Sequence, residues 1–291
     1  GIKEGEVYKR STLERVKSEL VRSYASNGRY GAGVEIEEVV KPRNRIEINI
    51  EVDEGKSAKI KKINIIGNEI YTNEELIDGF ELSEGSFFSF LSNDNQYSRE
   101  KLKGDIESLE SFYRDRGYLK FSIESSQISL SRDKKSIFIT FNVSEGEKYK
   151  INDVDVIGEV PFDEEVYIDI VESLKDTTYS QAAITSIEEF FTNVLGNRGY
   201  AFAEVTGNPE INEETNEVKL IFAVEPGNRT YTRKILFTGN NITQDHVLRR
   251  EMRQFEGAWS SDNAIEAGKI RLERLGYFKE VNVETIPVPG T

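Results

Sequence analysis

The sequence predicts an α+β fold built from tandem modules, each with the element order strand, helix, helix, strand, strand. One observation is a repeated junction, in which a glycine is followed by mainly apolar residues at offsets of five, eight and ten and by a second glycine at twelve. The three junctions begin at Gly55, Gly146 and Gly227. A second observation is a glycine that ends a long helical pattern and has a tyrosine twenty residues before it, which occurs three times. These pairs are Tyr8 with Gly28, Tyr97 with Gly117, and Tyr179 with Gly199. Such repetition is the signature of a modular array.

Composition and charge narrow the possible functions. The chain has 291 residues, of which 31% are charged, with no cysteine and one histidine. These counts exclude disulfides, thiolate metal sites and a histidine-built zinc site. The net charge of −14 argues against a nucleic-acid scaffold, which normally shows a basic face. Residues 228–291 differ, because ten Lys and Arg against eight Asp and Glu give +2 there and leave −16 on residues 1–227.

The first and last modules are predicted to be incomplete. Residues 1–55 lack the first strand and the first helix, and residues 228–291 lack the last strand. In 1–55, apolar spacings of three and four predict one helix, and alternation predicts two strands. The helix carries Leu13, Val16, Leu20 and Tyr24, and the strands span Tyr30–Val40 and Arg45–Val52. In 228–291 the expected elements are a strand over Thr232–Thr238, a helix over Gln244–Gln254, a second helix that ends at Gly276, and a following strand.

Residues 56–146 and 147–227 are predicted to be complete modules. In 56–146, alternation places strands at Lys59–Ile66, Tyr118–Leu130 and Ser136–Val143. A short helix begins near Thr72, where Glu75 completes a capping box. A longer helix buries Leu102, Ile106, Leu109 and Tyr113. Residues 147–227 repeat this order, with Ile184, Ile187, Phe191 and Leu195 on the inner face of the long helix.

Each complete module is expected to form a three-stranded mixed sheet covered on one face by its two helices. The short turn between the last two strands makes them an antiparallel hairpin, and the first strand pairs most economically with the third. This order leaves the second strand at an edge of the sheet. The modules are expected to follow one another as an elongated array, in which Gly55, Gly146 and Gly227 act as hinges.

Several stretches resemble POTRA repeats. They are the Gly-Tyr after the second helix (Gly117-Tyr118, Gly199-Tyr200 and Gly276-Tyr277), the Glu-Gly to Gly-Asn junction, and two longer segments, Phe112–Tyr118 and Val247–Trp259. The two segments are similar to the third and the last POTRA repeat of the bacterial outer-membrane β-barrel assembly machinery. The resemblance covers the chain from end to end, beginning inside the second repeat and stopping inside the fifth.

The resemblance implies a non-enzymatic periplasmic scaffold at the outer membrane of a Gram-negative bacterium. Such a scaffold recruits accessory lipoproteins and receives unfolded outer-membrane proteins by strand addition, with periplasmic chaperones as further partners. It implies no cofactor and no nucleic acid, and membrane contact through a β-barrel beyond Thr291. Two alternatives stay open. One is the POTRA region of a transporter for secreted proteins or autotransporters, and the other is a periplasmic spacer that binds no client.

The first candidate binding site is the edge strand of residues 56–146. Phe121 and Ile123 lie on one parity, whereas Ile128 and Leu130 lie on the other, so a β-bulge is expected near Ser125-Ser126. A bulge either protects an edge from aggregation or shapes it for a partner strand, and the resemblance favours docking. The candidate residues are Lys120, Phe121, Ser122, Ile123, Glu124, Ser125, Ser126, Gln127, Ile128, Ser129 and Leu130.

The second candidate is a charged segment of the last module. On a helix, Arg249 and Arg253 share a face, Arg250 lies beside that face, and Glu251 points to another side. The segment is either a solvated helix or a docking surface for a partner protein. The positive charge of this module, against the acidic average of the chain, favours docking.

No active site is predicted. Paired glutamates such as Glu37-Glu38 indicate a solvated acidic face, and His246 lacks the partners of a catalytic triad. No apolar run approaches the roughly 18 residues that indicate a transmembrane helix. The phenylalanine-rich loop from Phe87 to Leu91 is expected to pack on the core of its own module rather than to bind clients.

Overall fold

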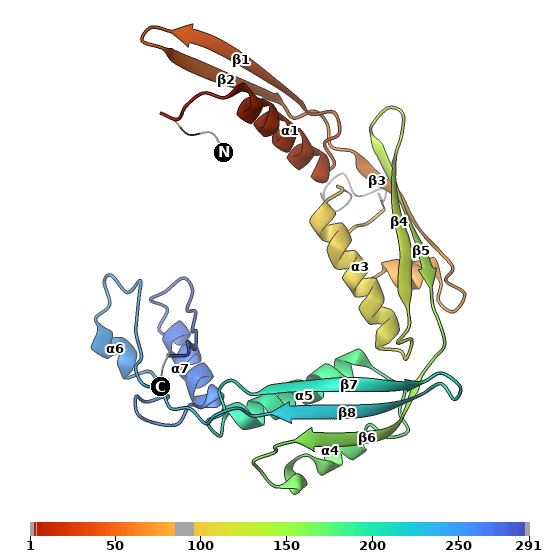
Figure 1. The fold of residues 1–291 in the computed structure, drawn as a ribbon, viewed down its shortest axis with the longest axis vertical. Helices are drawn as coiled ribbons and strands as arrows, with labels where there is room; N and C mark the ends of the chain where they lie inside the picture. Colours follow the sequence, from red (N-terminus) through yellow and green to blue (C-terminus); the bar gives the residue numbers. More distant parts are fainter. Residues whose placement is uncertain (1–2, 4, 85–95, 289–291) are drawn as a thin grey trace. The chain divides into compact units, whose positions relative to one another are not determined.

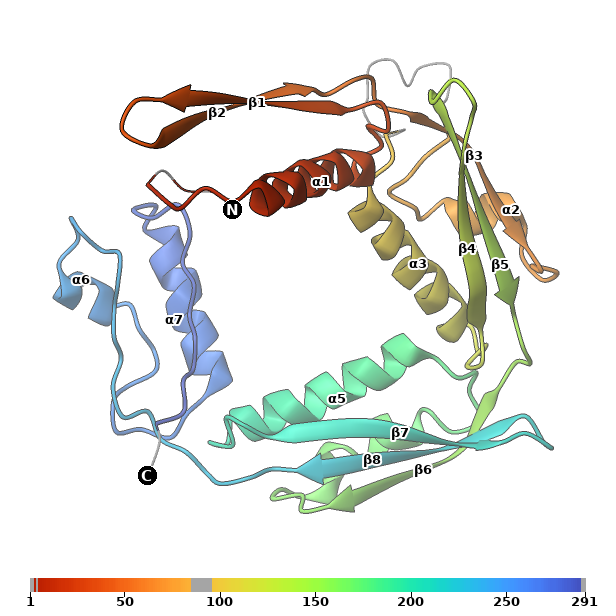
Figure 2. The ribbon, with the colours of Figure 1, turned by 45° about the horizontal axis from the view of Figure 1, so that its top comes forward.

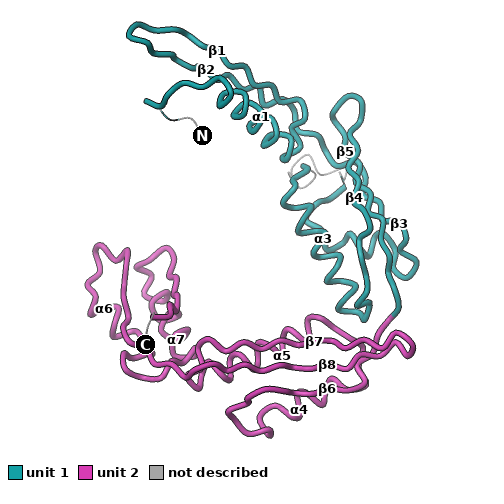
Figure 3. The backbone as a smooth tube through the Cα atoms, in the orientation of Figure 1, with its two compact units in different colours: residues 1–147 teal, residues 148–291 magenta. Residues whose placement is uncertain are grey.

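The computed structural model describes residues 3, 5–84 and 96–288. Figure 3 shows that the chain divides into two compact units, residues 1–147 and 148–291. Among the described residues, no helix is both long and apolar enough to cross a membrane. The phenylalanine-rich loop falls within residues 85–95, outside the described part of the chain, so the expectation for it stays a prediction.

In the first unit, residues 1–55 form a β-hairpin with one helix alongside it, as Figure 2 shows. Helix α1 spans Arg10–Ser26, and β1 (Gly33–Lys41) pairs in antiparallel fashion with β2 (Arg45–Asp53). Leu13 of α1 and Val34 of β1 are buried, because the apolar stripe of the helix faces the hairpin. The predicted order of helix, strand and strand is confirmed for this segment.

Residues 56–146, called the second module from here on, form the predicted mixed sheet (Figure 1). The strands are β3 (Lys59–Ile66), β4 (Ser122–Leu130) and β5 (Ser136–Ser144), and the helices are α2 (Asn73–Ile77) and α3 (Arg99–Arg114). The order is β3-β5-β4, with β3 parallel and β4 antiparallel to β5. The capping box at Thr72 is present, with Glu75 bonded back to its backbone. The predicted strand order, with the second strand of the module at the edge, is therefore confirmed.

The core of the second module lies between the sheet and α3. Its fully buried side chains include Leu109 and Tyr113 from the helix and Ile137, Ile139 and Phe141 from β5. The edge strand begins later than predicted, at Ser122 instead of Tyr118. The reason is a turn, because the N–H of Phe121 donates to the carbonyl of Tyr118 at 3.0 Å and closes the chain on itself before the sheet begins.

In the second unit, residues 147–227, called the third module, repeat this architecture. The strands are β6 (Lys150–Gly158), β7 (Glu204–Asn212) and β8 (Glu217–Glu225), in the order β6-β8-β7. The helical segments are η1 (Glu164–Val166), α4 (Ile168–Glu172) and α5 (Gln181–Gly196). The predicted inner face of α5 is buried, with Ile184, Ile187, Phe191 and Leu195 all in the core. Strand β7 again lies at an edge.

Residues 228–291, the fourth module, contain two helices, α6 (Asp245–Arg249) and α7 (Asp262–Arg274). The predicted strand over Thr232–Thr238 is wrong, since only an isolated bridge between Tyr231 and Trp259 forms there. In the two complete modules the first strand pairs with the third, and the described residues of 228–291 contain no such partner. The strand predicted after Gly276 is absent from the described residues for the same reason.

The first helix of the fourth module is shorter than the predicted range Gln244–Gln254, because α6 ends at Arg249. The chain then turns, and the side chain of Gln254 ties the turn together. Its amide nitrogen donates to the carbonyls of Phe255 and Trp259, and its oxygen accepts from the N–H of Ser261 at 3.0 Å. A side chain that bonds a loop backbone in this way competes with continued helix.

Candidate functional site

The edge strand β4 presents a row of main-chain groups that its own sheet does not use. Adjacent residues of an antiparallel strand point their N–H groups alternately toward and away from the partner strand. The N–H of Ser131, just after β4, donates to the carbonyl of Ser136 at 2.9 Å, which fixes the phase. The same phase directs Ser125, Gln127 and Ser129 toward β5. It directs Ser126, Ile128 and Leu130 outward.

The predicted bulge in β4 is present. The register between β4 and β5 shifts between Ile123 and Ser125, so Glu124 is the additional residue. The bulge lies one residue earlier than the predicted pair Ser125-Ser126. Before it, Ile123 packs against the core of the module, and after it Ile128 is 41% exposed. The extra residue therefore keeps Ile128 and Leu130 on the same face of the sheet as Ile123, opposite Ile139 and Ile137, and Leu130 packs against the core.

The first two residues of the predicted docking segment lie outside the strand. Lys120 and Phe121 precede β4, and Phe121 is buried, stacked on Tyr113 with ring centroids 4.0 Å apart. Phe121 therefore holds the start of the edge strand against the core. Glu124, Ser126 and Gln127 have exposed side chains, whereas Ser125 accepts a hydrogen bond from the side chain of Asn142 at 2.7 Å.

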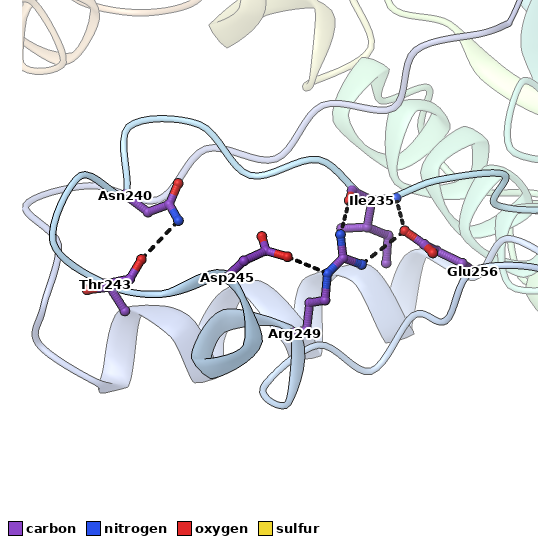
Figure 4. A network of polar contacts seen from close by, with 6 residues as sticks. All are labelled: Ile235, Asn240, Thr243, Asp245, Arg249 and Glu256. Atoms are coloured by element: carbon purple, nitrogen blue, oxygen red, sulfur yellow. Dashed lines mark hydrogen bonds and ion pairs between the residues drawn. The ribbon is translucent and has the colours of Figure 1, made fainter.

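In the fourth module, Arg249 holds a polar network that Figure 4 shows. Its Nε donates to Asp245 Oδ2 at 2.6 Å, and its two terminal nitrogens donate to Glu256 Oε1 and to the carbonyl of Ile235. Glu256 also accepts from the N–H of Ile235 at 2.8 Å. This main-chain bond, together with Arg249, lowers the pKa of Glu256, and the bonds to Asp245 and Glu256 raise the pKa of Arg249.

The Arg249 network joins the predicted docking segment to the stretch in which a strand was expected. Arg249 and Glu256 together bond both main-chain groups of Ile235, and the Arg249 guanidinium lies 5.4 Å from the centre of the Phe237 ring. Neither Asp245 nor Glu256 was predicted as a site residue, although a carboxylate four residues before an arginine on a helix, as Asp245 is, is a recognisable signal. No local sequence pattern predicted the role of Glu256, because its main-chain partner Ile235 lies 21 residues away in the chain.

The helical faces predicted for Arg249, Arg250, Glu251 and Arg253 do not form, because α6 ends at Arg249, and the side chain of Glu251 is only 14% exposed. Its Oε2 accepts two hydrogen bonds from Arg271 of α7, at 2.7 and 3.1 Å, and its Oε1 accepts one from Arg250. Arg271 is the main cause of the lowered pKa of Glu251. By contrast, Arg253 is exposed and makes no hydrogen bond or ion pair with the part of the chain that the structure describes.

The three predicted hinge glycines share one backbone conformation. Gly55, Gly146 and Gly227 have φ angles of +63°, +70° and +65°, a region that glycine adopts at low cost. Gly55 and Gly227 lie inside the two compact units, whereas Gly146 lies next to the border between them. In the second and fourth modules, the asparagine of the Gly-Asn motif (Asn68 or Asn240) donates to the carbonyl three residues later.

The described residues offer surfaces for binding and no metal site. No group of three or more His, Cys, Asp or Glu side chains is placed to hold a metal ion among them. The most distinctive features are instead a free sheet edge and a charged surface, which are means of binding proteins. A family model described as "POTRA: Surface antigen variable number repeat" matches residues 1–55, 58–146, 149–227 and 230–291.

The chain belongs to the POTRA family. Two relatives are both named "Outer membrane protein assembly factor BamA". The chain is 32% identical to the one from Neisseria meningitidis serogroup B, over 100% of this chain and 37% of that protein. It is 31% identical to the one from Buchnera aphidicola, over 89% of this chain and 42% of that protein. The POTRA chain thus spans less than half the length of these relatives.

A solved structure, the POTRA3-5 region of BamA from Haemophilus influenzae, is similar in fold. Its TM-score to this chain is 0.72 at 28% identity, and the match covers 80% of this chain and 92% of that one. Together these likenesses bear out the predicted tandem POTRA fold. They place the POTRA modules of this chain in the periplasm at the outer membrane.

Proposed function

We propose that this chain is a periplasmic scaffold of outer-membrane protein assembly that receives unfolded outer-membrane proteins by strand addition at β4. The observation that carries the proposal is the free edge of β4. Its N–H groups at Ser126, Ile128 and Leu130 point away from the sheet, and among the described residues they find no side-chain acceptor. The names of the relatives, which are assembly factors of the outer membrane, support the same role.

Strand addition suits such a role because its affinity comes from main-chain hydrogen bonds. Clients that differ in sequence share the same backbone, so one edge can accept many of them. The β4 edge contains no proline, and the side chains around its outward donors are small or apolar, namely those of Ser126, Ile128 and Leu130. Glu124 occupies the bulge, where it falls outside the regular part of the edge.

A proline scan tests the proposal directly. The probe is a synthetic peptide of about ten residues that alternates valine and threonine and carries a lysine at each end. Ser126→Pro and Ile128→Pro each remove one outward donor and leave the inward bonds of β4 intact. A lost main-chain bond is worth about 1 kcal/mol, and the proline ring also obstructs the incoming strand. We expect each variant to weaken peptide binding by about tenfold.

The matched controls are Ser126→Ala and Ile128→Ala, which keep the donors and change only the side chains. They should bind the peptide nearly as well as the unmodified chain. Equal losses in the alanine and proline variants would assign recognition to side chains. Unchanged binding in folded proline variants, checked by circular dichroism, would show that β4 does not accept a strand.

We further propose that the fourth module recruits accessory lipoproteins through the surface around Arg249, Arg250, Glu251 and Arg253. Because Arg253 is exposed and unpaired within the described residues, it is the cleanest probe of this surface. Arg253→Glu should reduce the amount of accessory lipoprotein that co-purifies with the full-length protein, while stability changes by no more than about 0.5 kcal/mol. Glu251→Lys should instead lower stability, because it places a cation against Arg271.

A further inference from the structure

We infer that the edge strand of the third module is closed to strand addition by two residues, Glu188 and Pro209, so that a client strand adds to β4 and not to β7. The inference rests on the proposed function of β4 and names the residues that set its specificity. The two strands occupy the same place in the two complete modules. Their difference therefore lies in side chains and not in topology.

The outward positions of β7 follow from the register of its sheet. The carbonyl of Asn216, just before β8, accepts the N–H of Lys150, the first residue of β6. The carbonyl of Val224, within β8, accepts the N–H of Glu159, the residue that follows β6. The even-numbered residues of β8 therefore face β6, and the odd-numbered ones face β7. In β7 this makes Thr206 and Asn208 inward residues, opposite Ala223 and Ile221. The outward positions of β7 are Val205, Gly207, Pro209 and Ile211.

The outward N–H of Gly207 is already occupied. It donates to Oε1 of Glu188, a residue of α5, at 2.6 Å. The carboxylate stands beside the sheet edge, where the backbone of an added strand would run. A hydrogen bond to a charged acceptor is stronger than one to a neutral carbonyl, so an incoming strand does not displace it without loss. The negative charge also repels the carbonyl oxygens of such a strand.

Helix α5 reaches this edge because Gly207 has no side chain. A Cβ at this position would lie 2.5 Å from Cγ2 of Ile184 and 3.0 Å from the ring of Phe222, closer than packed atoms approach. The bare backbone lets the helix lie close over β7 and brings Glu188 within reach of the edge. Nothing comparable is seen in the second module, where no side chain of the described residues bonds an outward N–H of β4.

Pro209 closes the next outward position, because proline has no N–H to donate. Two neighbouring outward donors in the middle of β7 are thus lost, one to a carboxylate and one to a ring. The remaining donors, Val205 and Ile211, are six residues apart, about 20 Å in an extended strand. A strand laid on β7 would receive donors only at its two ends. Prolines and charges at sheet edges are known means of preventing strand pairing.

The test uses the absence of cysteine from the chain, so that one introduced thiol reports one edge. Gln127→Cys marks β4 and Thr206→Cys marks β7. Both side chains are exposed and both residues point their N–H inward, so neither change alters an outward donor. The probe is the valine–threonine peptide with one central cysteine. Disulfide capture of the peptide is measured at each edge under the same redox buffer.

The opened variant combines Glu188→Ala with Pro209→Thr and so restores both missing donors of β7. In the unmodified background we expect capture at Gln127→Cys and little at Thr206→Cys. In the opened variant, capture at Thr206→Cys should rise by about thirtyfold, because two main-chain bonds become available. Capture at Gln127→Cys should not change. Circular dichroism checks that the opened variant is folded.

Two control variants separate the hydrogen bond from charge. In the Pro209→Thr background, Glu188→Gln keeps an oxygen that accepts the Gly207 N–H, so capture at Thr206→Cys should stay below that of the opened variant. In the same background, Glu189→Ala removes the same charge from the neighbouring exposed position and should also leave capture at Thr206→Cys low. Equal capture at both edges without any opening would overturn the inference, as would a folded opened variant that gains no capture at Thr206→Cys. Absent capture at Gln127→Cys would instead overturn the proposed function of β4.

Discussion

The two complete modules share one topology but hold their cores and edges differently. In the second module, the hydroxyl of Tyr113 donates to Glu145 at 2.7 Å, and Glu145 also accepts the N–H groups of Glu69 and Ile70. Tyr113 lies four residues before the helix-stop glycine, and the third module has Leu195 at that position. Glu145 lies one residue before the junction glycine, where the third module has Pro226, and both Leu195 and Pro226 are buried. A buried hydrogen-bonded pair in one module thus stands where the other has two apolar residues.

The two modules therefore share the positions of their core residues but not the kind of contact, polar or apolar, that those residues make. A buried polar pair is stable only when every member finds its partner, whereas an apolar pair needs only shape. The polar version ties the end of β5 to the loop after β3 through one carboxylate, which fixes the segment just before Gly146. The edge strands also share their positions but differ in their hydrogen-bond donors. Within the described part of the chain, the outward N–H groups of β4 are unoccupied, whereas β7 lacks two free outward donors, at Gly207 and Pro209.

The largest effect is expected from removal of the polar pair. Glu145→Ala leaves the buried Tyr113 hydroxyl without its acceptor, which costs about 1–3 kcal/mol, and removes the hydrogen bonds to the N–H groups of the exposed residues Glu69 and Ile70. We expect a loss of roughly 3 kcal/mol in the stability of the second module. Hydrogen exchange, followed by mass spectrometry on peptides of the second and third modules, measures it with an internal control. Equal protection in both modules would show that the pair does not hold the core.

A second effect concerns the glycine that brings α5 over β7. Gly207→Ala should destabilise the third module by about 2 kcal/mol, because the added methyl group overlaps Ile184 and Phe222. The matched control is Gly104→Ala on α3, where a Cβ meets nothing within 4 Å and alanine favours helix. That variant should gain up to about 1 kcal/mol. Urea unfolding of the two variants measures both changes, and a neutral Gly207→Ala would contradict the close approach.

The buried tyrosine also predicts a dependence on alkaline pH. Burial, and then the hydrogen bond to Glu145, raise the pKa of Tyr113 above its ordinary value of about 10. The folded state therefore keeps a proton that the unfolded state releases, so stability is full below about pH 10 and falls as the pH rises above it. Urea unfolding of the second module between pH 8 and 11 should show this fall. Tyr113→Phe should reduce it to the smaller part due to Tyr118, whose pKa is also raised.

The smallest effect is expected at the hinges. The N–H of Ala58 donates to the carbonyl of Gly28, and that of Thr230 to the carbonyl of Gly199, so these bonds bridge the junctions near Gly55 and Gly227. Spin-label distances across Gly146 should therefore be spread more widely than those across the other two junctions. Gly146→Ala should narrow that spread and cost about 1 kcal/mol, because its φ of +70° disfavours a side chain. A single narrow distance across Gly146 in the unmodified chain would rule out the hinge.

The sequence by itself determined the module order, the strand order and the bulge. Apolar alternation and the repeated glycines are local patterns, and they carry the information that a backbone needs to choose strand, helix or turn. The parity change between Ile123 and Ile128 predicted a bulge, and the register shift at Glu124 confirms it. The resemblance of the Gly-Asn junction to POTRA repeats was sufficient to predict the family, which the matches to known proteins confirm.

Only the tertiary structure decided which side chains meet. Tyr113 and Glu145 are 32 residues apart in the chain, and Glu188 and Gly207 are 19 apart. Neither hydrogen bond can therefore be predicted from a local sequence pattern. The strand expected over Thr232–Thr238 failed for a related reason, since a strand exists only where a partner supplies its hydrogen bonds. Which N–H groups of β4 point outward was equally undecided, because one residue more or less at the bulge reverses the direction of every group beyond it.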